Sequence, residues 1–104
     1  MNRLLGMLGL CARAGALITG EKACIQQIRS GKARAAVLDG AASDNAVKAV
    51  GQACRTHGVP LARTGLFELG DAIGKPGRMA AVVTDAGLAA QILQLSQVDT
   101  IDIQ

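Results

Sequence analysis

The sequence predicts an α/β fold, a three-layer α/β/α sandwich built by one domain. Short apolar segments alternate with longer amphipathic segments along the chain, as in proteins whose strands and helices alternate. A chain of 104 residues is the length of a single domain, so residues 1–104 are expected to fold as one unit. Half of the residues are hydrophobic and only Phe67 is aromatic, so small aliphatic side chains must build the core.

The amphipathic segments predict five helices with recognisable ends. Gly15, Gly31 and Gly58 follow the first three segments, and glycine commonly ends a helix. Ser43 is the expected N-cap of the third helix, because its hydroxyl can accept a hydrogen bond from the first turn. The expected helices cover residues 2–13, 20 or 21 to about 30, 45–57, 66–73, and 85 or 86 to 95.

The apolar segments between the helices predict strands at residues 17–19, 35–39, 61–63 and 79–84. The continuous apolar run at 35–39 indicates a strand that is buried on both faces. The most apolar segment, 79–84, is expected at the centre of the sheet. The tail at 98–103 alternates apolar and polar residues, which predicts an edge strand.

Positive charge is concentrated in the first third of the chain. Residues 1–34 contain six basic residues and one acidic residue, whereas residues 85–104 contain three acidic residues and no basic residue. This asymmetry favours a basic face that binds an acidic polymer, although many proteins have one basic side by chance. The single aromatic residue excludes a nucleic-acid surface that works by aromatic stacking, so binding would depend on charge, shape and helix ends.

No metal site, cofactor or membrane segment is predicted. The three cysteines are widely spaced and His57 is the only histidine, whereas a structural zinc site needs four close ligands. The N-terminal apolar segment fits an amphipathic helix better than a signal peptide, and no apolar run is long enough to span a membrane. We expect a cytoplasmic protein whose cysteines are buried and reduced, namely Cys11, Cys24 and Cys54.

No catalytic residues are predicted either. Gly15 and Gly20 have the spacing of a phosphate-binding P-loop, but Glu21 stands where that loop needs a lysine. His57 has no obvious acidic partner, and no serine lies in the sequence context of a nucleophile elbow. The remaining acids of interest are at turns or helix starts, where structural roles are expected: Asp39, Asp44 and Asp71.

Two basic, glycine-containing segments are the candidate functional residues. The first, residues 18–22, ends a predicted strand and starts a helix, whose free N–H groups attract anions. Glu21 can accept hydrogen bonds from base amino groups and Lys22 can bind phosphate, although an acid in a first helical turn also simply stabilises the helix. The second is the loop 74–78. The two segments form one surface only if their strand ends lie at the same edge of the sheet; otherwise the loop cations are merely solvated.

Five motifs follow one another within residues 4–95: Thr19-Gly20-Glu21, Ser30-Gly31-Lys32-Ala33, Leu38-Asp39-Gly40-Ala41-Ala42-Ser43, Leu69-Gly70-x-Ala72-Ile73-Gly74-Lys75 and Ala81-Val82-Val83-Thr84-Asp85. In this order and spacing they resemble the kink-turn RNA-binding family of ribosomal protein L7Ae, in particular its small stand-alone bacterial members. The resemblance implies a mixed four-stranded sheet in a non-catalytic protein. It also implies binding to a kink-turn, a sharply bent RNA duplex with sheared G·A pairs beside the bend, for example in ribosomal RNA.

The resemblance further implies which residues contact the RNA. The start of the second helix enters the groove at the G·A pairs, and the loop before the last core strand covers an extruded nucleotide. Glu21 would then bind a base amino group, while the cations would bind phosphates. The implied contacts are Gly20, Glu21, Lys22, Ile73, Gly74, Lys75, Pro76, Gly77 and Arg78, with Lys32 and Arg34 as outer contacts.

The sequence departs from the family pattern in both contact segments. Gly20 stands where archaeal-type members have Asn, and Cys24 stands where they have Lys, so two polar base contacts are missing. The loop 74–78 is polar where tight binders are hydrophobic. We therefore expect weaker and more electrostatic RNA binding. The first alternative is a protein-interaction module that uses the same basic face for an acidic partner, and the second is an enzyme with an unrecognised active site.

Overall fold

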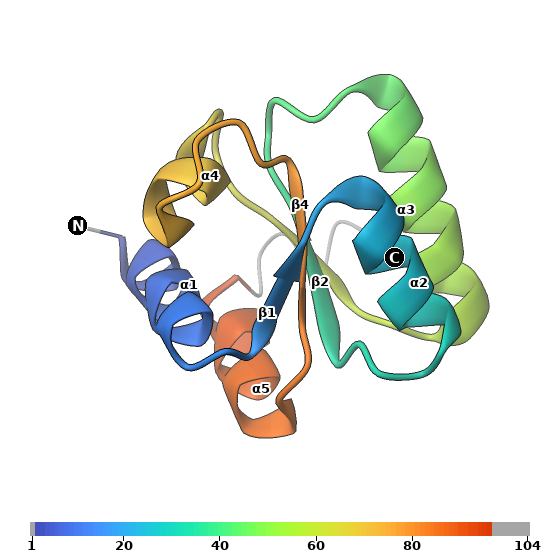
Figure 1. Ribbon diagram of the computed structural model, residues 1–104, viewed down its shortest axis with the longest axis horizontal. Helices are drawn as coiled ribbons and strands as arrows, with labels where there is room; N and C mark the ends of the chain where they lie inside the picture. The colour runs from blue at the N-terminus through green and yellow to red at the C-terminus, as the bar shows by residue number, and fades with distance from the viewer. Residues whose placement is uncertain (1, 97–104) are drawn as a thin grey trace.

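The computed structural model describes residues 2–96, which form a layer of strands between two layers of helices (Figure 1). This is the three-layer α/β/α sandwich that the alternation of segments predicts. In chain order the elements are α1 (Arg3–Arg13), β1 (Leu17–Thr19), α2 (Glu21–Arg29), β2 (Ala35–Leu38), α3 (Asp44–His57), β3 (Leu61–Arg63), α4 (Glu68–Ile73), β4 (Ala80–Val83) and α5 (Ala86–Leu95).

The four strands form one mixed sheet in the spatial order β1-β4-β2-β3. β2 and β3 are parallel, whereas β4 is antiparallel to both β1 and β2. The most apolar strand, β4, is therefore central as expected, and both β4 and β2 are buried along their whole length. β1, β2 and β3 all finish at the end of the sheet where β4 begins, and we call this the carboxyl end.

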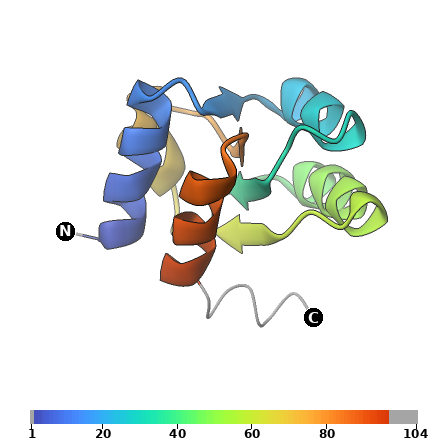
Figure 2. The ribbon, with the colours of Figure 1, turned by 90° about the horizontal axis from the view of Figure 1, so that it is seen from below.

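Helices cover both faces of the sheet (Figures 1 and 2). α2 and α3 pack on one face, and α1, α4 and α5 pack on the other. The side chains of β2 alternate accordingly: Ala36 and Leu38 join the core under α2 and α3, whereas Ala35 and Val37 join the opposite core. Each face of the sheet therefore has its own hydrophobic core.

Most predicted element ends agree with the structure, but α4 begins later than expected. The Ser43 hydroxyl caps α3 by accepting a hydrogen bond from Ala46 N, as its position predicts. α4 starts at Glu68 rather than at residue 66, because Phe67 has a φ of 61°, which no α-helical residue adopts. The strand expected at 98–103 lies outside the described residues.

A buried carboxylate connects the loops of the carboxyl end. Asp39 has no exposed surface, and it accepts hydrogen bonds from Ala41 N (2.8 Å), Phe67 N (2.7 Å), Leu69 N (2.9 Å) and Thr64 Oγ1 (2.9 Å). Burial raises the pKa of the carboxyl group, but these hydrogen bonds together lower it more, so the pKa lies below its ordinary value. Asp39 thus fixes the β2–α3 and β3–α4 loops against each other.

Candidate nucleic-acid interface

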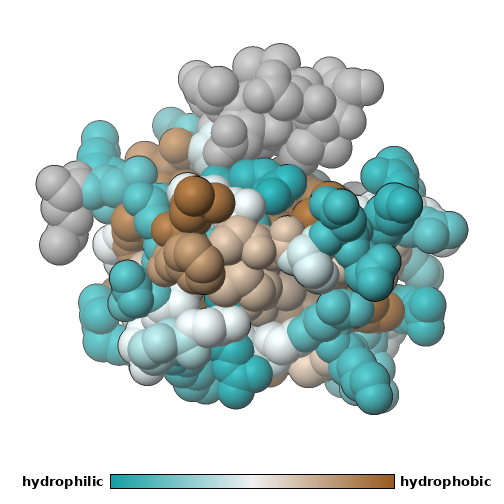
Figure 3. All heavy atoms as spheres, turned by 90° about the horizontal axis from the view of Figure 1, so that it is seen from above, coloured by the Kyte–Doolittle hydropathy of each residue, from teal (hydrophilic) through white to brown (hydrophobic). Residues whose placement is uncertain are grey.

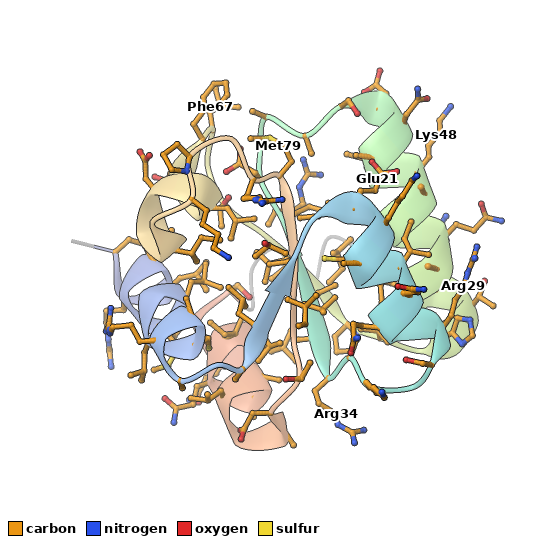
Figure 4. All side chains as sticks on the ribbon, in the orientation of Figure 1. Glu21, Arg29, Arg34, Lys48, Phe67 and Met79 are labelled. Carbon is orange, nitrogen blue, oxygen red and sulfur yellow. The ribbon has the colours of Figure 1, made fainter. Side chains whose placement is uncertain are left out.

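The two basic segments predicted from the sequence meet at the carboxyl end of the sheet. Gly20 N, just after β1, donates a hydrogen bond of 3.1 Å to Ala80 O at the start of β4. Arg78 reaches this junction, because its Nη1 atom lies 3.5 Å from the position that a Cβ on Gly20 would occupy. Glu21 and Met79 accordingly lie at the same end of the molecule in Figure 4. The start of α2 and the loop 74–78 therefore form one surface.

The start of α2 leaves its first N–H groups open. Gly20 has φ 101° and ψ 140°, a conformation that glycine adopts without strain, and no side chain within residues 2–96 caps the helix. By contrast, Asn2, Ser43 and Asp85 cap α1, α3 and α5. An uncapped N-terminus carries free N–H donors and the positive end of the helix dipole, so it attracts an anion. Glu21 and Lys22, both exposed, flank these donors.

The loop 74–78 is a tight turn that is packed against α4. Gly70 lies so close beneath it that a Cβ there would be 2.7 Å from Lys75 O and 3.0 Å from Gly77 N. Lys75 N also donates a hydrogen bond of 2.9 Å to Gly70 O. All five residues of the loop are exposed, including Pro76 and Arg78. The backbone contacts with α4 thus hold the two loop cations in a defined position at the surface.

A cavity of about 430 Å³ opens beside this surface. Ile73 and Lys75 line it together with Arg13 of α1 and Thr19 of β1. Thr19 and Lys75 line the same cavity, and Thr19 immediately precedes Gly20. Lys75 and the start of α2 therefore lie at the same end of the molecule. Ile73 is half-buried in the wall of the cavity, so only part of its side chain is accessible.

Two predicted contacts are not brought into this surface. Lys32 and Arg34 precede β2 and therefore lie at the opposite end of the sheet. Arg34 N donates a hydrogen bond of 2.8 Å to Val83 O at the end of β4, and Figure 4 shows the Arg34 side chain far from Glu21. A contact between either residue and RNA stays a prediction, and it requires a part of the RNA away from Glu21.

The structure adds residues that sequence reasoning missed. Lys48 lies in the first half of α3, which also begins at the carboxyl end, and Figure 4 shows it on the same side as Glu21. Leu66 and Phe67 are 70% and 62% exposed in the β3–α4 loop. Seen from this end, an apolar patch is bordered by hydrophilic side chains (Figure 3). The place of Lys48 could have been inferred from the sequence, because it follows the Ser43 cap by about one helical turn. No feature of the sequence indicated that Phe67 is exposed at this end of the sheet.

The structure also explains the missing polar contact at position 24. Cys24 has no exposed surface and its Sγ atom donates a hydrogen bond of 3.5 Å to Ile18 O, so its side chain belongs to the core. Burial raises the pKa of Cys24 to about 12 and that of Cys54 to about 11, which keeps both thiols protonated and unreactive at neutral pH.

No group of three or more His, Cys, Asp or Glu residues within 2–96 could hold a metal ion. No helix in that range is long and apolar enough to cross a membrane.

Residues 2–93 match the Ribosomal protein L7Ae/L30e/S12e/Gadd45 family. The chain belongs to this family. It is 36% identical over 90 residues to the RNA-binding protein YlxQ of Bacillus subtilis (strain 168), an alignment that covers 86% of this chain and 90% of the relative. It is 35% identical over 97 residues to the RNA-binding protein YlxQ of Enterococcus faecium, covering 90% of this chain and 91% of that protein.

Solved structures of other proteins share the fold of this family member. A protein of unknown function from Bacillus halodurans has a TM-score of 0.89 and 31% identity, covering 93% of this chain and 99% of that one. The 15.5kD RNA binding protein of Giardia lamblia has a TM-score of 0.74 and 24% identity, covering 91% of this chain and 85% of that one. At that identity the second likeness concerns the fold alone. Both comparisons agree with the mixed sheet and its two helical layers.

Proposed function

We propose that this protein is a non-catalytic RNA-binding protein that recognises a kink-turn or a similarly bent duplex at the carboxyl end of its sheet. The observation that carries the proposal is the convergence of Glu21, at an uncapped helix start, with the Arg78 side chain and the loop 74–78. The names of the two bacterial relatives and the family match support RNA as the ligand. The family also includes ribosomal proteins, which makes ribosomal RNA in the cytoplasm one source of such a bend.

Each side chain of the surface has a distinct chemical role in this proposal. The Glu21 carboxylate accepts a hydrogen bond from a guanine or adenine amino group, which a sharp bend exposes and a regular A-form helix hides. Lys22, Lys75 and Arg78 bind phosphates and hold the RNA in register. The free N–H groups at the start of α2 attract the same phosphate backbone. Specificity therefore depends on Glu21, and most of the affinity depends on the cations.

Binding at this surface should be strongly electrostatic. Gly20 presents no side chain to a base and Cys24 is buried, so Glu21 is the exposed carboxylate in the first turn of α2 that can accept a hydrogen bond from a base. Three phosphate contacts predict that log K falls with log salt concentration with a slope of roughly −2 to −3. Such a slope at a modest affinity would distinguish this protein from binders that rely on apolar loop contacts.

The direct test compares two RNAs that differ only at the bend. One is a kink-turn oligonucleotide, and the other has its G·A pairs replaced by Watson–Crick pairs. Fluorescence anisotropy at several salt concentrations should show tighter binding to the kink-turn, with similar salt slopes for the two RNAs. Equal affinities would leave only general charge attraction. In that case the alternative, a module that binds an acidic protein through this basic face, would become the better explanation.

A further inference from the structure

The outer faces of α2 and α3 carry the same polar pattern. α2 has Lys22, Gln26 and Arg29, and α3 has Lys48, Gln52 and Arg55, so both helices contain Lys-x-x-x-Gln-x-x-Arg. Residues at this spacing lie on one face of a helix, and all six side chains are exposed. Each helix therefore presents a polar stripe with a cation at both ends, separated by about 10 Å along the axis.

The two stripes lie side by side and run in the same direction. Both helices begin at the carboxyl end, because β1 and β2 finish there, and α2 packs against α3 (Figure 1). Packed helices have axes about 8–10 Å apart, so the four cations stand near the corners of a square of roughly that size. A groove of about 290 Å³ separates the stripes and is lined by Arg29, Gln52 and His57 among others. Figure 4 shows Lys48 and Arg29 on this same outer side of the molecule.

The positive charge of the chain is concentrated in α2, α3 and the loop 30–34 that follows α2. Residues 21–34 and 44–57 contain six cations (Lys22, Arg29, Lys32, Arg34, Lys48 and Arg55) and two acids (Glu21 and Asp44). Four of these cations belong to the two stripes, and Lys32 and Arg34 belong to the loop. All other residues together contain five cations and six acids. The two acids of the layer lie in the first turns of α2 and α3, so they leave the stripes basic along the rest of their length. A surface with this charge attracts a polyanion.

We propose that the outer face of α2 and α3 binds the phosphate backbone of a duplex RNA stem. The stripes begin beside Glu21, so the bound stem is the one that extends from the bend along α2 and α3. This choice of stem rests on the proposed function, which puts the bend at Glu21. The four cations contact phosphates, and the glutamine amides donate hydrogen bonds to the same backbone. A duplex fits this face because phosphates recur regularly along it. The face offers cations spaced both along each helix and from one helix to the other. The contact reads no sequence; it selects RNAs with a continuous stem at that position.

The test combines stem length with charge removal. Three kink-turn RNAs are compared: one with short stems, and two in which one stem or the other is extended by a helical turn. Wild-type protein should bind one extended RNA more tightly than the short RNA. The double variant Arg29→Gln/Arg55→Gln should lose roughly tenfold affinity for that extended RNA, with a salt slope shallower by about two, and should bind the short RNA as the wild type does.

Matched variants separate this contact from general charge attraction. Arg3 is an exposed helical arginine on the opposite layer, so Arg3→Gln makes the same charge change as Arg55→Gln away from the stripes. Arg55→Gln should weaken binding to the extended RNA, whereas Arg3→Gln should not. The double variant Arg29→Lys/Arg55→Lys keeps both charges, so it should bind the extended RNA nearly as tightly as the wild type does. Equal losses from the two single variants, or unchanged binding by the double variant, would overturn the proposal. A stem-length effect that persists without discrimination of the G·A pairs would overturn only the proposed kink-turn recognition.

Discussion

The guanidinium of Arg78 lies across the start of α2, with its Nη1 atom 3.5 Å from the position of a Cβ on Gly20. Gly20 also has a φ of 101°, which side chains rarely tolerate. The backbone conformation therefore favours glycine at this position, and Arg78 lies at an ordinary contact distance from it. This explains in physical terms why a residue with a base-reading side chain is absent there. The same contact shows that the two segments of the proposed RNA surface adjoin each other.

Gly20→Ala should damage both stability and RNA binding. The positive φ should cost about 1–2 kcal/mol of unfolding free energy, and the strain at the start of α2 should shift Glu21 and weaken RNA binding. Gly6→Ala is the control, because Gly6 lies on an exposed helical position with nothing within 4 Å of a new Cβ. That change should stabilise the protein by up to about 1 kcal/mol. Denaturant unfolding and anisotropy would measure both effects; equal stability of the two variants would contradict the strain at Gly20.

Asp39→Asn should produce a pH-dependent loss of stability. Because the pKa of Asp39 is lowered in the folded state, its ionised form stabilises the fold above the unfolded pKa of about 3.9, and this contribution is lost as the pH falls through the folded pKa. At pH 7 the variant should lose about 3 kcal/mol, since an amide replaces a buried carboxylate with four donors. The difference from wild type should shrink in unfolding measurements below pH 4. A constant difference at all pH values would exclude the ionised form as the cause.

Phe67 provides a test of backbone strain that is independent of RNA. Phe67→Val should destabilise the protein by at least about 1 kcal/mol, because a β-branched residue fits poorly at a φ of 61°. Phe67→Gly removes the aromatic ring and should still cost less, since glycine adopts this φ without strain and the ring is 62% exposed. Thermal unfolding of both variants would give the order. A more stable Val variant would show that apolar contacts of the ring outweigh the strain.

Local signals explain why most of the fold was predictable. The Ser43 cap, the glycines after helices and the apolar run of β4 each act within a few residues, so they mark element ends without any knowledge of the tertiary structure. The late start of α4 was not predictable, because it follows from hydrogen bonds between Asp39 and residues 28 and 30 positions later. Asp39 itself looked like an ordinary turn residue for the same reason.

The candidate site was predictable in its parts but not in its arrangement. Gly20, Glu21 and the loop 74–78 have the right composition locally, but their convergence depends on the strand order β1-β4-β2-β3. Lys32 and Arg34 lie far from Glu21 for another reason: they precede β2, whereas Glu21 follows β1, and both strands finish at the carboxyl end. The presence of a single aromatic residue predicts a surface without aromatic stacking. That residue, Phe67, is nevertheless exposed at the carboxyl end. Lys48 and the rest of the α3 stripe adjoin the α2 stripe only because α3 packs beside α2, which is a tertiary contact.

The role of Glu21 is the central claim, and one ratio tests it most directly. The affinity for a kink-turn, divided by that for the same RNA without G·A pairs, is measured for wild type, Glu21→Ala and Lys75→Ala. Removing a base contact should reduce this ratio roughly 5- to 150-fold in Glu21→Ala, which corresponds to about 1–3 kcal/mol of discrimination. Lys75→Ala should weaken binding to both RNAs alike and preserve the ratio. A Glu21→Ala ratio equal to that of wild type would contradict the account.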